Sequence, residues 1–413
     1  MNAMTSPADD RDVRSHRARR PLGMVAVAAA SAMVMAACSS GTKSGSATST
    51  SSAPPANSSP IKIGVLMSLS GPYATLFGPY QKTVTAWAAQ NPTILGRPVQ
   101  VIIQDDQGTT AGGEAATRLL IDQDHVDMMV GPGISNVDVA ALPLIKAAGI
   151  VDVQPTAFPA AGDPSQNPYV FPDNYSSDQQ TALFSAAVTA VHAQKIGLLG
   201  EDSALGHGTV SAIQADKTFN VVGTQFFPTG STNLTTEEQK LQADGADAVI
   251  LAAVVPQDII AAVQGLGLIG WKAPLIGTSV AAFPQLVQAY GPLAKQVIVT
   301  GFTRATLNPL SSAQQQVRTQ LQTILGGTTL PIPLFTALLY WVPLELLKYG
   351  IEGARSTDAA TFSHYIEKQG GYNSLVGFLH YTASSHVGMT PAEAAIPDLS
   401  TLSDGTFDVL SGS

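Results

Sequence analysis

Short apolar runs alternate with helical patterns along this chain, and glycine or proline stands at most of the joints. In the first half, the patterns predict strands at 61–68, 99–104, 126–130 and 150–153, with helices at 79–90, 111–122 and 135–148 between them. Strands and helices that alternate in this way are typical of βαβ units, in which crossover helices join parallel strands. We therefore expect an α/β fold built on a parallel sheet.

The same alternation restarts after residue 175. It predicts strands at 195–199, 221–226, 247–252, 274–276 and 297–301, and helices at 178–193, 208–219, 235–245 and 256–264. Two later helices, at 334–350 and 359–368, precede a C-terminal segment with short strands. A chain of 413 residues is long enough for two domains. The expected fold class is therefore α/β, with two doubly wound parallel-sheet lobes.

Two helix starts carry the residue pattern of a capping box, in which two side chains three positions apart satisfy free backbone N–H groups. Ser135 with Asp138 has this pattern, and Thr235 with Glu238 repeats it. Both pairs are expected to cap helices, and capping alone is one explanation for Ser135.

The first 60 residues have the organisation of an exported lipoprotein. Five arginines precede an apolar run at 21–37, and Met35-Ala-Ala-Cys38 then resembles a bacterial lipobox. Basic, apolar and small residues in this order are typical of a secretory signal. Residues 1–37 are therefore expected to be a signal peptide, exported by the general or the twin-arginine route, with Cys38 as the lipidated residue. The alternative is an uncleaved membrane anchor, in which Cys38 occurs by chance and is not lipidated.

Residues 38–60 are expected to be the lipidated cysteine and a flexible tether, because Ser, Thr, Gly and Pro dominate after Cys38. Such a tether would hold the globular part at the extracytoplasmic face of the cell membrane. Cys38 is the single cysteine, which leaves no disulfide framework and no cysteine-based metal site. A net charge of −9 with only 12% charged residues argues against a nucleic-acid partner.

Several patterns look catalytic but lack the context that the chemistry needs. Gly265, Gly267 and Gly270 match G-x-G-x-x-G, but they follow a predicted helix and precede a strand, the reverse of a dinucleotide site. Ser40 and Lys43 match S-x-x-K only within the expected tether. No serine lies in a complete G-x-S-x-G motif, and the seven histidines show no metal-ligand spacing. We expect no enzyme activity and no cofactor.

The chain from residue 61 resembles the type I periplasmic binding proteins of ABC transporters, in particular the leucine/isoleucine/valine-binding branch. The motifs that carry the resemblance are Ile61-Lys-Ile-Gly-Val, Ser70-Gly-Pro, Gln104-Asp-Asp, Gly131 with Ser135-Asn, Gly149-Ile with Pro155, and Asp178-Gln. The resemblance implies two α/β lobes joined by three hinge strands, with a small ligand enclosed in the cleft. Lobe 1 would comprise 61–176 and 300–396, and lobe 2 would comprise 177–299 and 397–413.

In the first lobe, the expected wall of the ligand cleft includes the loop that leads into Ser135 and Asn136. Ligands bind beyond the carboxyl ends of parallel strands, and free N–H groups at a helix start suit a carboxylate. The resemblance also implies aromatic or loop contacts, for which the candidates are Tyr73, Phe77, Ala157 and Phe158. Packing in the core is the alternative for each aromatic side chain. For Asp105 and Asp106, we favour turn capping over ligand contact.

The second-lobe positions depart from the amino-acid-binding members of the family. Where those members carry an acidic residue for the ligand's ammonium group, this chain has Ser279, and Leu205 and Val254 stand at two tyrosine positions. No Asp or Glu occurs between Gly265 and Tyr290. A buried ammonium group without a partner costs several kcal/mol. We therefore expect an apolar or aromatic carboxylate or amide rather than a standard α-amino acid.

The resemblance implies a monomeric solute-binding protein that delivers its ligand to an ABC permease. One alternative is a ligand-sensing subunit of a membrane receptor, and another is a conventional branched-chain amino acid binder. An exported hydrolase would need a nucleophile and a base, which the motifs do not supply. A regulator of the LacI kind would carry an N-terminal DNA-binding domain in place of the signal peptide.

Overall fold

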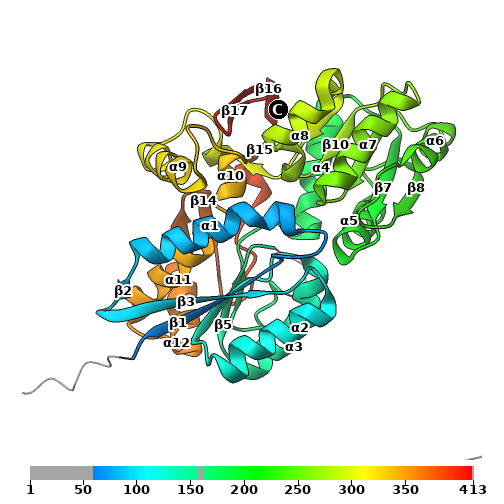
Figure 1. Ribbon diagram of the computed structural model, residues 1–413. Coiled ribbons are helices and arrows are strands. Elements are labelled where there is room, and N and C mark those ends of the chain that lie inside the picture. Colours follow the sequence, from blue (N-terminus) through cyan, green and yellow to red (C-terminus); the bar gives the residue numbers. More distant parts are fainter. Residues whose placement is uncertain (1–58, 157–160, 412–413) are drawn as a thin grey trace, which may run out of the picture. The chain divides into compact units, whose positions relative to one another are not determined.

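The computed structural model describes residues 59–156 and 161–411, all within the compact unit Ala56–Ser413. The expected signal peptide, the lipidation site Cys38 and nearly all of the tether lie outside the described residues, as do Ala157 and Phe158. The described part contains two large sheets flanked by helices (Figure 1).

The first sheet has six strands in the order β2-β3-β1-β4-β5-β6. These strands are β1 (Ile61–Met67), β2 (Thr93–Ile94), β3 (Arg97–Asp105), β4 (Met128–Val130), β5 (Val151–Gln154) and β6 (Val170–Pro172). Only β2 is antiparallel to its neighbour. Strands β4 and β5 are wholly buried, as expected for parallel strands that are covered on both faces.

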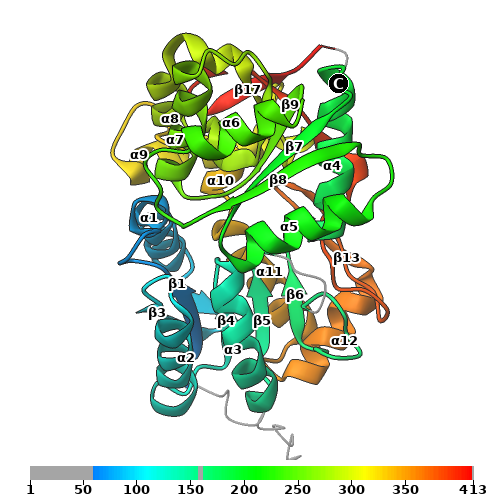
Figure 2. The ribbon, with the colours of Figure 1, turned by 90° about the vertical axis from the view of Figure 1, so that its right-hand side faces the viewer.

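The helices of this first lobe are α1 (Ala74–Gln90), α2 (Thr110–Arg118), which continues into the π-helical turn η1 (Leu119–Gln123), and α3 (Ser135–Ala148). Figures 1 and 2 show α2 and α3 side by side on one face of the sheet. Helix α3 begins directly after β4, so its N-terminus lies at the carboxyl edge of the sheet.

The second sheet has five parallel strands in the order β11-β10-β9-β7-β8. These strands are β7 (Ile196–Glu201), β8 (Val221–Phe227), β9 (Ala248–Ala252), β10 (Leu275–Gly277) and β11 (Val297–Val299). The helices of this second lobe are α4 (Ser177–Ala190), α5 (Ala204–Ala215), α6 (Thr235–Ala243), α7 (Pro256–Leu268), η2 (Ser279–Ala282), α8 (Pro284–Tyr290) and η3 (Gly291–Gln296).

The chain after β11 contributes elements to both lobes. Its helices are η4 (Arg304–Thr306), α9 (Ser312–Leu325), α10 (Leu334–Ala337), α11 (Trp341–Ala354), α12 (Ala359–Gln369) and η5 (Pro391–Glu393). Its strands form three small antiparallel pairs: β12 (Phe302–Thr303) with β15 (Ala394–Ala395), β13 (Gly371–Ser374) with β14 (Gly377–His380), and β16 (Pro397–Ser403) with β17 (Thr406–Val409). Helices α11 and α12 pack on β5 of the first sheet, whereas β16 contacts β11 of the second.

The predicted order of strands and helices is confirmed in both halves, but several boundaries were wrong. Helix α1 begins at Ala74 and runs through Pro79, the residue at which the helix was expected to begin. The helix predicted at 334–350 is two helices, because residues 338–340 lie between α10 and α11. Strand β6 and helices α8 and α9 were not predicted, and neither were the two-residue strands β2 and β12.

Both predicted capping boxes are wrong. The N-cap residues are Ile134 for α3 and Leu234 for α6, and neither provides a side-chain cap. The side chain of Asp138 instead receives a hydrogen bond from Thr156. Both carboxyl oxygens of Glu238 are buried without a hydrogen-bond partner in the described part. The helices whose capping boxes do form are α4, at Ser176, and α9, at Ser311.

The three glycines of the G-x-G-x-x-G pattern lie at the end of α7, which runs to Leu268 instead of ending at residue 264 as predicted. Gly265 and Gly267 belong to the helix, and Gly270 follows it with a φ of +67°. A Cβ on Gly265 would lie 2.1 Å from Glu238 Oε2, so this glycine leaves room for a buried carboxyl group. Within 59–156 and 161–411, no helix combines the length and the apolar character needed to cross a membrane.

Candidate functional site

A cavity of about 320 Å³ lies where the carboxyl ends of strands from both sheets meet. The first lobe lines it with the start of α1 and the residues that follow β4, β5 and β6. The second lobe contributes the residues that follow β7, β9, β10 and β11, and α10 adds part of the wall. Crevices at the carboxyl ends of strands are the usual ligand sites of open α/β sheets.

The cavity brings together every predicted ligand-binding residue that the structure describes. These residues are Tyr73, Phe77, Ser135, Asn136, Leu205, Val254 and Ser279. Ala157 and Phe158 lie outside the described residues, but their neighbours Pro155 and Thr156 line the cavity. Contact of these residues with a ligand stays a prediction.

Helix α3 provides the polar part of the first-lobe wall. Ser135 is its first residue and Asn136 its second, and both line the cavity. The first N–H groups of an α-helix have no acceptor within the helix, and the helix dipole makes this end positive. This end of α3 can therefore bind an anionic or hydrogen-bond-accepting group.

The loop before α3 is tightly packed, and this fixes its position. A Cβ on Gly131 would lie 2.5 Å from the Leu66 carbonyl oxygen, and its φ of +96° also favours glycine. A Cβ on Gly133 would lie 2.5 Å from the Tyr340 hydroxyl oxygen. Larger residues at either position would displace the start of α3 from the cavity.

Aromatic rings form the apolar part of the same wall. The Phe77 ring packs edge-on against Tyr80 and Tyr340, with ring centroids 5.4 and 6.0 Å apart. Tyr340 donates a hydrogen bond of 3.1 Å to the Leu66 carbonyl oxygen. Phe77 therefore both packs in the core and lines the cavity, so the two interpretations of this residue are compatible.

Tyr73 lies almost fully buried at the cavity, with 3% of its surface exposed. Its hydroxyl forms a hydrogen bond with Thr229, in the loop after β8 of the second lobe. Burial raises the pKa of Tyr73, and the carboxyl groups of Glu201 and Asp258 raise it further. The side chain thus connects the two lobes at the edge of the cavity as a neutral phenol.

Glu201, the last residue of β7, lines the cavity with 1% of its surface exposed. Its Oε1 accepts a hydrogen bond of 2.7 Å from the Ser203 hydroxyl, and its Oε2 accepts one of 3.3 Å from the Val254 N–H. Burial raises the pKa of Glu201 above its ordinary value. No Lys, Arg or His occurs among the described residues that line the cavity.

Glu201 was not among the predicted site residues, because the position that corresponds to the acidic residue of the amino-acid-binding members was identified as Ser279. The signal was present, since Glu201 lies two residues after the apolar run at 195–199 that predicts β7, and ligands bind beyond the strand ends in this type of sheet. The second-lobe wall therefore contains a carboxyl group, contrary to the expectation of a wall without one.

Three further polar groups lie in the cavity wall; Asn136 was predicted there, whereas Tyr175 and Thr336 were not. Asn136 Oδ1, the Tyr175 hydroxyl and the Thr336 hydroxyl are buried and have no hydrogen-bond partner within the described part. An unsatisfied buried polar atom costs about 1–3 kcal/mol. A ligand with complementary groups would remove this cost.

Asp105 and Asp106 hold turns, as expected, and do not line the cavity. Asp105 accepts hydrogen bonds from the N–H groups of Leu69, Ser70 and Gln107. Asp106 Oδ1 accepts from the Ser68 hydroxyl at 2.6 Å and from the Gly108 N–H. Among the residues that the structure describes, no group of three His, Cys, Asp or Glu side chains is placed to hold a metal ion.

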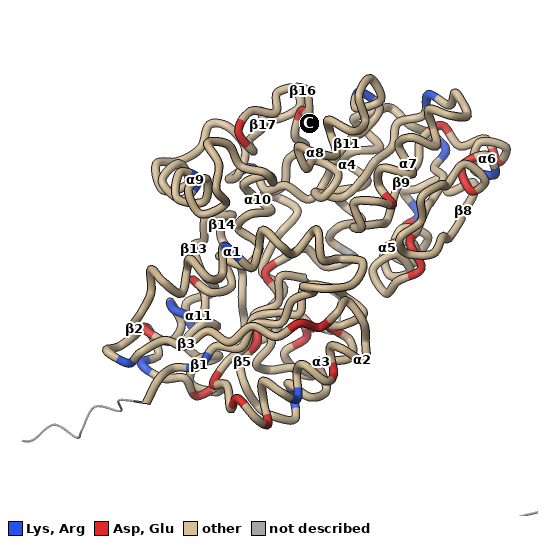
Figure 3. Tube along the Cα trace, viewed as in Figure 1, with Lys and Arg blue, Asp and Glu red and all other residues tan. Residues whose placement is uncertain are grey.

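The charged residues are spread over the fold. Figure 3 shows Lys and Arg at separated positions on both lobes. The described residues that line the cavity include no Lys or Arg. A ligand carboxylate in this cavity would be bound by N–H and hydroxyl donors rather than by an ion pair.

Comparison with solved structures shows the same fold in several solute-binding proteins. A leucine binding protein from Thermotoga maritima MSB8 has 17% identity and a TM-score of 0.73, covering 85% of this chain and 98% of its own. An ABC transporter solute-binding protein from R. palustris, in complex with 4-hydroxybenzoate, has 18% identity and a TM-score of 0.69, covering 85% and 95%. A branched-chain amino acid binding protein from Streptococcus pneumoniae, in complex with isoleucine, has 20% identity and a TM-score of 0.70, covering 85% and 99%.

No curated protein sequence matches this chain. The family model for periplasmic binding proteins matches residues 60–395, which include both sheets and the whole cavity wall. The two-lobed α/β fold and the cavity at the strand ends agree with this match. The chain therefore belongs to the periplasmic binding protein family, which is a family of binding proteins and not of enzymes, and it has the fold of the type I members.

Proposed function

We propose that this protein captures a small ligand in the cavity between its lobes and delivers it to the permease of an ABC importer. The observation that carries the proposal is the cavity of about 320 Å³ whose walls come from the strand ends of both lobes. A ligand bound there contacts both lobes at once, so binding favours the closed arrangement. A permease can distinguish the loaded protein from the empty one by that arrangement.

The proposed lobes have the boundaries that the sequence suggested. Lobe 1 comprises 61–176 and 300–396, and lobe 2 comprises 177–299 and 397–413. The packing of α11 and α12 on β5, and of β16 on β11, supports this division. The chain then crosses between the lobes three times.

We propose an apolar or aromatic carboxylate or amide as the ligand. Phe77, Leu205 and Val254 provide apolar surface, and the start of α3 provides hydrogen-bond donors for a carboxylate or amide oxygen. Ser279 stands where an acidic residue would bind an ammonium group in amino-acid-binding members. The similar protein that is in complex with 4-hydroxybenzoate supports this class.

A branched-chain amino acid is the second candidate, because Glu201 lies in the cavity wall. Its carboxyl oxygens already accept hydrogen bonds from Ser203 and Val254. An ionised Glu201 could in addition accept a hydrogen bond from a ligand ammonium group. The similar protein that is in complex with isoleucine favours this alternative.

We also propose that lipidation of Cys38 holds the protein at the outer face of the cell membrane, close to the permease. The order of arginines, apolar run and Met35-Ala-Ala-Cys38 supports this, together with the Ser- and Pro-rich tether that follows. The family match to periplasmic binding proteins agrees with a location outside the cytoplasm.

Thermal unfolding of the purified full-length protein with a ligand panel tests the proposed function. The panel contains 4-hydroxybenzoate, benzoate, benzamide, leucine and isoleucine. A ligand that binds only the folded protein adds about 2.7 kcal/mol of stability at a hundredfold excess over its Kd. We expect the melting temperature to rise with the aromatic acids or the amide, and Ser135→Ala to reduce the rise. A rise with leucine or isoleucine alone would contradict the proposed ligand class.

A further inference from the structure

The second-lobe wall of the cavity is made largely by three loops that follow different strands. Residues 202–205 follow β7, residues 253–255 follow β9, and residues 278–279 follow β10. The pairing between these parallel strands ends before the loops begin, so contacts between the loops must hold the wall together. The residues of these loops that line the cavity are Ser203, Ala204, Leu205, Val254, Thr278 and Ser279.

Glu201, the last residue of β7, connects the first two loops. Its Oε1 accepts a hydrogen bond of 2.7 Å from the Ser203 hydroxyl, in the loop after β7. Its Oε2 accepts one of 3.3 Å from the Val254 N–H, in the loop after β9. One buried carboxyl group therefore fixes the two loops relative to each other.

The contact with Ser203 also holds the turn that contains Leu205. Ser203 is the N-cap residue of α5, and its Oγ accepts a hydrogen bond of 3.1 Å from the Gly206 N–H. A Cβ on Gly206 would lie 2.0 Å from the Glu201 carbonyl oxygen, so the start of α5 packs directly on the backbone of Glu201. Leu205 lies between these two anchored residues. Its place in the wall therefore depends on Glu201.

The contact with Val254 continues to the third loop. The Val254 N–H and the Ala253 carbonyl belong to the same planar peptide group. This group donates to Glu201 through its N–H, and its oxygen accepts a hydrogen bond of 3.3 Å from the Thr278 hydroxyl. Thr278 is buried and directly precedes Ser279. Hydrogen bonds thus link Glu201 to all three loops of the wall.

Glu201 is placed to hold this wall together. Only 1% of its surface is exposed, and both of its carboxyl oxygens accept hydrogen bonds from the second lobe. Without the carboxyl group, the Val254 N–H would lose this acceptor. A backbone N–H that is shielded from water and loses its partner is unfavourable, so the loop would rearrange.

We propose that Glu201 is a positioning residue that holds the three loops of the second-lobe wall in place and thereby sets the shape of the apolar surface formed by Leu205 and Val254. Selectivity on this side of the cavity then comes from the fit of the ligand's apolar part, and not from an ammonium group bound by Glu201. The inference rests on the proposed function, because it takes the cavity as the ligand site.

Two substitutions at Glu201 separate positioning from charge. In Glu201→Gln, the amide oxygen can accept from the Val254 N–H and the amide NH₂ group can donate to Ser203 Oγ, so both contacts are kept without the charge. In Glu201→Ala, both contacts are lost. Asp202→Ala is the matched control, because the neighbouring Asp202 is exposed, contacts His207 and does not line the cavity.

The first test needs no ligand. Hydrogen–deuterium exchange is measured by mass spectrometry on the full-length wild type and the three variants. Glu201→Ala should raise the exchange rate about tenfold in segments 202–206, 253–255 and 278–281, whereas Glu201→Gln should keep the wild-type rates. The third segment is the most informative, because the hydrogen bonds that link it to Glu201 run through the peptide group before Val254.

The first-lobe loop at 131–137 is the internal reference and should exchange at the wild-type rate in every variant. An equal rise there would indicate general destabilisation, and an unchanged rate at 278–281 in Glu201→Ala would show that the loops are not coupled. Either result would overturn the proposal. If Glu201→Ala does not fold, Glu201→Asp takes its place with the same expected result, because its side chain is one methylene group shorter.

The second test measures the affinity of benzoate and leucine by calorimetry. The compound that binds should bind roughly tenfold more weakly to Glu201→Ala, and Glu201→Gln should recover the affinity to within about threefold of the wild type. Asp202→Ala should bind as the wild type does. If Glu201 bound an ammonium group through its charge, Glu201→Gln would weaken leucine as much as Glu201→Ala does, which would overturn the proposal.

The two proposals can fail separately. If neither compound binds, the proposed ligand class is wrong, and the exchange measurement still decides the role of Glu201. If leucine binds and Glu201→Gln recovers its affinity, the ligand class is wrong but the positioning role is supported. If Glu201→Ala binds its ligand as tightly as the wild type, the positioning role is wrong and the proposed function is unaffected.

Discussion

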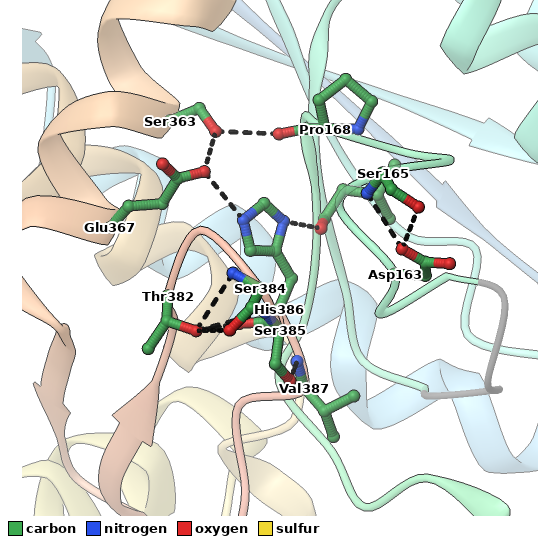
Figure 4. Close-up of polar contacts among 11 residues, drawn as sticks. Asp163, Ser165, Pro168, Ser363, Glu367, Thr382, Ser384, Ser385, His386 and Val387 are labelled. Carbon is green, nitrogen blue, oxygen red and sulfur yellow. Dashed lines mark hydrogen bonds and ion pairs between the residues drawn. The ribbon is translucent and has the colours of Figure 1, made fainter.

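His386 Nε2 lies 3.1 Å from Glu367 Oε1, in a contact that joins the loop after β14 to helix α12 (Figure 4). The imidazole is completely buried, and its Nδ1 lies 2.9 Å from the Val170 carbonyl oxygen. Its ring stacks on Phe171 of β6, with ring centroids 4.2 Å apart. A single histidine thus attaches a C-terminal loop to the edge of the first sheet.

Replacing His386 with alanine is expected to destabilise the protein by about 2–4 kcal/mol, because the change leaves a cavity beside Phe171 and removes the hydrogen bonding of the buried imidazole. The free energy of unfolding in urea measures the effect. His380→Ala is the matched control, since His380 is exposed on β14. Equal effects of the two substitutions would contradict the structural role of His386.

The contribution of His386 to the stability of the protein should depend on pH in a predictable direction. Burial lowers the pKa of His386, while Glu367 and the Val170 carbonyl oppose the shift. The unfolded state therefore binds the proton more tightly, and the contribution of His386 to stability falls as the pH drops below about 6.5. We expect the difference in melting temperature between the wild type and His386→Gln to change in that direction on acidification. A pH-independent difference would contradict this.

Glu238 is expected to lower the stability of the protein at neutral pH. Burial raises its pKa to about 9 from an ordinary value of 4.5, with a further contribution from Glu237. Its favourable contribution is complete below about pH 4.5 and is lost as the pH rises toward about 9. Glu238→Gln should therefore stabilise the protein at pH 7 by on the order of 3 kcal/mol, measured by urea unfolding. Glu237→Gln is the control, and a stabilisation that did not grow with pH would argue against this origin.

Gly265→Ala tests the packing interpretation of the G-x-G-x-x-G pattern. The new Cβ would lie 2.1 Å from Glu238 Oε2, and we expect a destabilisation of about 1–3 kcal/mol. Gly78→Ala is the control, because Gly78 lies inside α1 and a Cβ added there would meet no atom within 4 Å, so this change should be neutral or slightly stabilising. Equal effects on the midpoint of unfolding would contradict the steric explanation.

Ser279→Asp should change the ligand preference. A carboxylate at this position repels a ligand carboxylate and attracts an ammonium group, so benzoate affinity should fall roughly tenfold or more. Calorimetry with benzoate and leucine measures the change. Ser312→Asp, on an exposed helix start, controls for the added charge. An unchanged benzoate affinity would place the ligand away from Ser279.

Cys38→Ser should release the protein from the membrane fraction of the cells that express it. The thiol is the proposed site of lipid attachment, and a serine hydroxyl does not replace it. Fractionation followed by immunodetection measures the distribution between membrane and soluble fractions. Ser40→Ala, two residues further along, should leave the distribution unchanged. Retention of Cys38→Ser in the membrane would favour the uncleaved anchor.

The sequence by itself determined the alternation of strands and helices, the two large parallel sheets and the loops that line the cavity. Burial of parallel strands requires continuous apolar runs, and these runs are local and visible in the sequence, as at β1 and β9. The strand ends identify the loop that contains Ser135, and the family resemblance identified Leu205 and Ser279, so all three were assigned to the cavity wall without coordinates.

The tertiary structure alone decided the partners of the buried polar groups. The Ser135–Asp138 and Thr235–Glu238 patterns predicted local caps, but Asp138 is bonded to Thr156 and Glu238 faces Gly265. Glu201 lines the cavity because β7 ends beside the loop that contains Val254, whose N–H donates a hydrogen bond to Glu201 Oε2. The spacing of residues in the sequence shows only which groups can form hydrogen bonds within one helical turn. In the folded protein, buried polar groups are shielded from water, so contacts between residues distant in sequence determine their charge and their hydrogen-bond partners.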